Sequence, residues 1–142
     1  MILCAVGGLA GAIQAAVMGE LGERVGIAPA LVFAVAVSLV CAFGVLIVWD
    51  RSFSGVRDAL DHPWWLWLGG VMSVFIVLAI TVAAPRIGVA ATIGVVIAGN
   101  LVMAALIDQY GLLGQEQVAI TWPRLLGLLL LAAGAALSLT RP

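Results

Sequence analysis

The stretch IVLAITVAAPRIGVAATIGVVIAGNLVMAAL, residues 76–106, is apolar on both sides of one short break, Pro85-Arg86-Ile87-Gly88. Proline and glycine interrupt regular structure, so these four residues favour a tight turn. An arginine between two apolar runs marks a membrane surface, because a charge inside hydrocarbon is costly. The stretch therefore predicts two antiparallel transmembrane helices joined outside the hydrocarbon.

The rest of the chain repeats this apolar character. Of the 142 residues 65% are hydrophobic and only 9% are charged, against about 25% charged in soluble domains. A membrane-crossing helix needs about 20 apolar residues, with a range of roughly 17–25. We expect an all-α membrane protein, a single transmembrane domain over 1–142 with its termini on opposite sides. Its five spans are predicted at residues 2–19, 28–48, 64–84, 89–107 and 122–139.

Tryptophans cluster in the sequence PWWLW at the start of the third apolar run. Indole rings prefer the headgroup level of a bilayer, so Trp64, Trp65 and Trp67 are better explained as interface anchors than as a ligand-stacking site. We nevertheless keep Trp67 among the candidate substrate contacts.

The arginines are evenly divided between the two expected membrane sides. Orientation follows the Lys/Arg bias of short loops, and this chain has no Lys. A tie can arise by chance, or it can mean that copies insert both ways and pair antiparallel. The five runs look like one half of an inverted-repeat transporter, and we identify no internal repeat that supplies the other half. One side holds Arg51, Arg57 and Arg124, and the other holds Arg24, Arg86 and Arg141.

Small residues recur every four positions in the first two runs, as at Gly7, Gly11 and Ala15, and at Ala34 and Ser38. Such spacing lets helix backbones approach closely in lipid. Both stripes are predicted packing seams, within one chain or between two.

Few polar side chains fall within the spans, and no Asp, Glu, Arg or His lies mid-span. Ser and Thr can bond the carbonyl four residues earlier, whereas Gln14 and Asn100 need other partners. Asn100 lies roughly opposite the small residues Gly94 and Ala98 at 100° per residue. Each amide either joins neighbouring helices or lines a cavity. We favour the cavity for Asn100 and an interhelical bond for Gln14, and we keep Gln14 and Ser73 with Asn100 in the candidate substrate site.

Several functional classes are not expected. The chain lacks the basic patch of a nucleic-acid-binding protein. Neither a nucleophile–base pair nor a phosphate loop nor metal-ligand spacing is evident, so we expect no enzyme, cofactor or metal site. Glu20, just past the first run, is best explained as a solvated carboxylate at the interface.

The sequence resembles the YdcZ-like inner-membrane exporters, a five-span branch of the drug/metabolite transporter superfamily. The resemblance rests on PWWLWLGG, APRIG, IAGN and DQYGLLG, in that order, and on Gln14. It implies a multi-pass protein of the bacterial inner membrane that works as a dual-topology or paired-gene assembly. The family tends to have Gln at Asn100 and often Asn at Met18, so this chain departs from it at both positions.

The sequence therefore predicts a secondary transporter, an exporter of a small organic molecule. It would act in lipid as an antiparallel homodimer or paired with a homologous chain. The alternatives are a dual-topology channel for a small ion and a membrane scaffold subunit that transports nothing.

Overall fold

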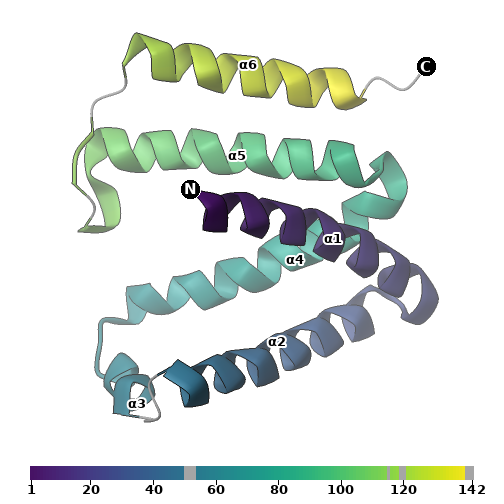
Figure 1. The fold of residues 1–142 in the computed structure, drawn as a ribbon, viewed down its shortest axis with the longest axis vertical. Helices are drawn as coiled ribbons and strands as arrows, with labels where there is room; N and C mark the ends of the chain where they lie inside the picture. Colours follow the sequence, from purple (N-terminus) through teal and green to yellow (C-terminus); the bar gives the residue numbers. More distant parts are fainter. Residues whose placement is uncertain (50–53, 115, 119–120, 140–142) are drawn as a thin grey trace. The chain divides into compact units, whose positions relative to one another are not determined.

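The computed structural model describes residues 1–49, 54–114, 116–118 and 121–139, and it describes Ser54, Gly114 and Arg124 by their backbone alone. Within these ranges every regular element is helical. The elements, drawn in Figure 1, are α1 (Ile2–Val25), α2 (Ile27–Trp49), α3 (Ser54–Leu60), η1 (Trp64–Trp67), α4 (Leu68–Ile87), α5 (Val89–Tyr110), η2 (Leu112–Gly114) and α6 (Trp122–Leu139).

Four helical segments are long and apolar enough to cross a membrane: Ile2–Val25, Ile27–Trp49, Trp64–Ile87 and Val89–Tyr110. The fifth expected span coincides with α6, whose apolar part, Leu125–Leu139, is shorter. The expected all-helical membrane architecture is thus confirmed, with four candidate spans and one shorter apolar helix. The crossing of α6, and with it the sidedness of the termini, stays a prediction.

The first helix is longer than the sequence suggested. We placed residues 20–27 in a connection, but α1 continues through Val25 and leaves only Gly26 before α2. The charged residues do not end the helix because Glu and Arg are good helix formers, and Glu20 and Arg24, four apart, pair along its surface. Gly26 has φ of 92°, a conformation that L side chains rarely adopt, so glycine makes this one-residue turn possible.

The turn between α4 and α5 is also tighter than expected. Pro85 was placed in that turn, yet it lies inside α4, which runs to Ile87. Proline lacks an N–H, so the carbonyl of Thr81 loses its helical donor, a loss confined to the last turn. Gly88 alone makes the turn, with φ 86° and ψ 156°.

The end of α5 is closed by the segment that follows it. Gly111, in the left-handed conformation with φ 60°, caps the helix. The N–H of Val118 donates to the carbonyl of Asp108 at 2.8 Å, and Gln117 Nε2 donates to the carbonyl of Gln109 at 2.8 Å. These bonds occupy carbonyls that a helix end leaves unpaired. The connection expected from residue 108 therefore begins three residues later.

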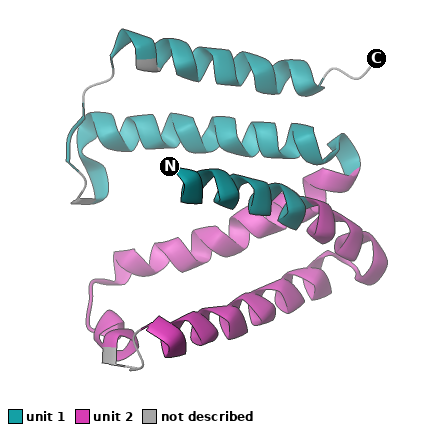
Figure 2. Cartoon of the chain, in the orientation of Figure 1, with its two compact units in different colours: residues 1–15, 86–142 teal, residues 16–85 magenta. Residues whose placement is uncertain are grey.

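The chain divides into two compact units, coloured in Figure 2: residues 1–15 with 86–142, and residues 16–85. In the first unit α5 and α6 run side by side and antiparallel (Figure 1). A Cβ added at Gly94 would lie 3.5 Å from Ser138 Oγ and 3.6 Å from Ala135 Cβ, which is ordinary contact. A Cβ would therefore fit at Gly94, and the packing of α5 on α6 does not depend on a missing side chain there. The expectation of a single domain over 1–142 stays a prediction.

In the second unit the end of α1 packs against the end of α4. A Cβ at Gly19 would lie 3.2 Å from Ala84 Cβ, and one at Gly22 would lie 2.7 Å from Thr81 Cγ2. The second distance is too short for any real Cβ. A side chain at Gly22 would therefore require Thr81 or one of the two helices to shift, whereas the backbone of Gly22 does not itself favour glycine.

The predicted packing seams are only partly occupied in the single chain. A Cβ at Gly7 or Gly11 would meet nothing within 4 Å, while Ala15 is fully buried. On α2, Ala34 is half-buried and Ser38 is exposed. The role of these residues in a dimer stays a prediction.

Candidate functional site

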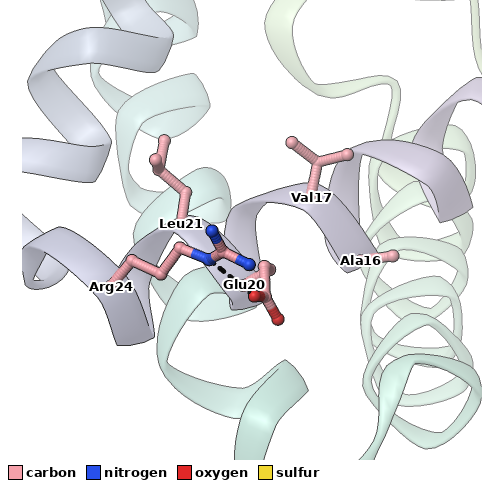
Figure 3. A pocket seen from close by; sticks show the side chains of 5 residues that line it. All are labelled: Ala16, Val17, Glu20, Leu21 and Arg24. Carbon is pink, nitrogen blue, oxygen red and sulfur yellow. Dashed lines mark hydrogen bonds and ion pairs between the residues drawn. The ribbon is translucent and has the colours of Figure 1, made fainter.

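A shallow groove of about 390 Å³ follows one side of α1 near its end, as Figure 3 shows. Glu20 and Arg24 point toward one another from successive turns, and Arg24 Nε donates to Glu20 Oε1 at 2.7 Å. Their side chains are 60% and 74% exposed, respectively. An exposed i,i+4 pair stabilises a helix by only about 0.3–0.5 kcal/mol, so folding does not require it. The groove is lined by Ala16, Val17, Glu20, Leu21 and Arg24.

The groove combines one ion pair with an apolar wall. Ala16, Val17 and Leu21 supply the wall, and the paired charges carry no net charge. This arrangement fits an amphipathic molecule whose polar end lies at the pair. The sequence suggested a solvated carboxylate at Glu20, and its exposed side chain agrees, but the pairing with Arg24 was missed. The signal was present, because a Glu four residues before an Arg on a helix is a favoured pair.

A second groove, of about 240 Å³, lies between α2 and α3. Its lining offers no polar side chain with which to orient a substrate, so it is the weaker candidate. It is lined by Leu39, Ala42, Phe43, Leu46 and Val56.

Asn100 is an exposed residue of α5, about 80° around the helix from buried Thr92. At about 100° per residue it is roughly 180° around the helix from buried Ala91 and roughly 140° from buried Ala105. Its side chain is exposed and has no hydrogen-bond partner among the described residues. Within this part of the chain, Asn100 does not join α5 to another helix.

The other predicted substrate contacts are also exposed. Gln14 lies on α1 in the unit that contains Asn100, while Trp67, at the end of η1, and Ser73, on α4, belong to the other unit. Neither Gln14 nor Ser73 has a hydrogen-bond partner among the described residues. The four-residue site therefore stays a prediction.

The buried hydroxyls, by contrast, are satisfied within their own helices. Thr81 Oγ1 donates to the carbonyl of Val77 at 2.7 Å, and Thr92 Oγ1 donates to that of Gly88 at 2.8 Å. The expected bonding of hydroxyls to carbonyls four residues earlier is confirmed at both positions. These threonines have no donor left for a substrate.

Potential metal ligands do not gather in the described part of the chain, where no three His, Cys, Asp or Glu side chains lie together. Cys4 and Cys41 are free and exposed there. Among the residues counted for orientation, Arg51 and Arg141 lie outside the described ranges.

Comparison with known proteins supplies a family but no individual relative. No curated protein and no solved structure matches the chain. The model of one family, described as "Putative inner membrane exporter, YdcZ", matches residues 1–137. That match covers all the helices except the last two residues of α6. Together with the membrane-length helices, it shows a multi-pass transporter of the inner membrane, and the chain belongs to the YdcZ family of inner-membrane exporters.

Proposed function

We propose that the chain exports a small organic molecule and does so as an antiparallel pair, formed by two copies or by this chain and a homologous one. The observation that carries this proposal is the match to an exporter family over residues 1–137. The match gives the class of activity, and the polar side chains exposed on the helices indicate where a substrate would bind.

The exposed amides support a cavity. Asn100 and Gln14 lie on membrane-length helices and have no hydrogen-bond partner among the described residues. An unpaired polar group in hydrocarbon costs free energy that a partner chain, water or a substrate must recover. Asn100 points away from the side of α5 that is buried at Ala91 and Ala105, so a second chain or a water-filled cavity would cover it. The proposed substrate contacts are Asn100, Gln14, Ser73 and Trp67.

The arginine balance and the open glycines support an antiparallel pair. Three arginines on each expected side give neither orientation an advantage. An antiparallel pair supplies the inverted half that transporters with inverted repeats carry in one chain. Gly7 and Gly11 offer a surface of α1 on which added Cβ atoms meet nothing, as close contact with a second chain requires.

The test uses proteoliposomes filled with a deproteinised bacterial metabolite extract, with release followed by mass spectrometry. Protein-free liposomes and liposomes with an unrelated small membrane protein are the controls. The proposal expects a small set of organic compounds to leave only in the presence of this chain, with a rate that saturates with concentration. Release of small ions alone without saturation would identify a channel. No protein-dependent release would contradict transport.

A further inference from the structure

Two segments of the chain are similar to each other at a fixed spacing of 62 residues. Residues 24–42 read RVGIAPALVFAVAVSLVCA, and residues 86–104 read RIGVAATIGVVIAGNLVMA. Of the 19 aligned positions, seven are identical, and at four others Val, Ile or Leu replace one another. The identical pairs are Arg24/Arg86, Gly26/Gly88, Ala28/Ala90, Ala36/Ala98, Leu39/Leu101, Val40/Val102 and Ala42/Ala104.

The structure repeats in the same register. Arg24 and Arg86 each lie in the last turn of a helix, and two residues later a single glycine makes the turn, with φ of 92° at Gly26 and 86° at Gly88. The next helix begins at once in both places. The N–H groups of Ala30 and Thr92 donate to the glycine carbonyls at 3.1 and 3.0 Å. An alignment made from sequence alone thus superimposes two turns of unusual geometry.

Burial agrees with the same spacing. Met18 is 4% exposed and its counterpart Ile80 is 6% exposed, while Ala30 and Thr92 are 0% and 2% exposed. The agreement is confined to the surroundings of the two turns, because Ala91 and Ala105, 3% and 5% exposed, correspond to exposed Pro29 and Phe43. The spacing of 62 therefore relates residues 2–49 to residues 64–111, a range that includes all of α5.

The contact between α1 and α4 has the form expected of two equivalent surfaces. In the alignment, Gly19 corresponds to Thr81 and Gly22 corresponds to Ala84. Gly19 packs on Ala84 and Gly22 packs on Thr81. Gly19 thus meets the counterpart of Gly22, and Gly22 meets the counterpart of Gly19, which is the reciprocity that defines a two-fold, self-complementary contact. Each of the two contacts pairs a glycine with a side chain.

We propose that the chain contains two copies of one helical hairpin, residues 2–49 and 64–110, and that α1 and α4 meet through a self-complementary surface. If each spanning helix crosses the membrane once, the two copies run in the same direction, because two crossings separate the start of α1 from the start of α4. This parallel repeat does not supply an inverted half, so it is compatible with an antiparallel pair of chains. Connection 50–63 joins the copies, and α6 is an addition to the repeat.

The test exchanges the contact residues between the two copies. The variant Gly19→Thr/Gly22→Ala/Thr81→Gly/Ala84→Gly moves both side chains from α4 to α1 and keeps the composition of the wild type. If the surface is two-fold, both glycine–side chain contacts are restored. The controls change one helix each: Gly19→Thr/Gly22→Ala crowds the contact, and Thr81→Gly/Ala84→Gly empties it. The measurement is the midpoint of thermal unfolding in detergent.

Both half-exchanged variants are expected to lose several degrees, and the full exchange is expected to recover most of the loss. A full exchange no more stable than Gly19→Thr/Gly22→Ala would overturn the proposal. A milder pair covers the case in which these variants do not fold. Gly22→Ala should lower the midpoint because its Cβ meets Thr81 Cγ2, and adding Thr81→Ala should raise it again. Absence of that rescue would also overturn the proposal. Gly11→Ala, whose Cβ meets nothing, is the matched control.

Discussion

At the scale of single residues, the most informative side chain is the amide of Asn100. It combines exposure, lack of a partner among the described residues and a position on α5 away from buried Ala91 and Ala105. A residue that only joined helices would be expected on a packed face. Its position therefore agrees with contact to substrate or to a second chain, and substitution can separate these roles.

Replacing Asn100 by Leu is expected to abolish transport while folding and pairing stay near normal. A site built to bond a polar substrate is weakened strongly when its donor and acceptor are removed, whereas an interhelical bond contributes about 1 kcal/mol. Asn100→Gln should keep partial activity because it retains the amide. The measurement is release of the exported compounds per folded protein in proteoliposomes. Met103→Leu, an exposed neighbour on α5, is the control. Unchanged release in Asn100→Leu would remove this residue from the site.

Gly88 is expected to tolerate no side chain. Its φ of 86° and ψ of 156° fall in a region that only glycine occupies readily, so Gly88→Ala should destabilise the protein by about 1–3 kcal/mol. The comparison is Gly44→Ala in the middle of α2, where an added Cβ meets nothing and alanine favours the helix. Unfolding in detergent measures both. Equal stability of the two variants would show that the turn differs from the one described.

At the scale of elements, the apolar runs predicted the helices well and their ends poorly. Length and hydropathy depend on the bilayer, which every spanning helix must match, so the runs were visible without a structure. Helix ends depend on local contacts instead. Glu20 and Arg24 are good helix formers and lie within the extension of α1, and the position of Pro85 in the last turn of α4 lets that helix continue. The similarity of RVGIA and RIGVA was readable from the sequence and was missed because a repeat was sought as an inverted half.

The ends of the helices can be tested by labelling. In a background without Cys4 and Cys41, Arg86→Cys should react with an impermeant thiol reagent, because it lies in the last exposed turn of α4. Val95→Cys, nearly two turns into α5, should not react. The readout is a mass shift after labelling of intact membranes. Equal labelling of the two cysteines would contradict the crossing of α4 and α5.

At the scale of the whole molecule, the proposed antiparallel pair depends on the absence of an orientation preference. The site could be predicted only as a set of polar positions, because Asn100 and Gln14 lie in one compact unit and Ser73 and Trp67 in the other. Whether these four residues form one site depends on how the units and chains assemble. Assembly in lipid is decided by small differences in packing and loop charge rather than by hydrophobicity.

Reporter tags at the C-terminus are expected to be detected on both sides of the membrane in whole cells. Adding two arginines within residues 50–63 should then favour the orientation that places this connection in the cytoplasm, by the bias that positive charge imposes on short loops. Two added glutamines at the same place are the control. A tag found on one side only, and unmoved by the added arginines, would contradict dual topology.

The one-residue turns at Gly26 and Gly88 limit where another protein can bind the chain outside the membrane. If each spanning helix crosses once, both turns lie on the same membrane face, where they expose almost no loop that an antibody or a protease could bind. In the described part of the chain, the longer connections between the long helices, 54–67 and 111–118, would then lie on the opposite membrane face. A 14.6 kDa chain needs an added binder to be visible in single-particle imaging. In an antiparallel pair, a binder raised against those connections would mark both faces of the particle, once on each side.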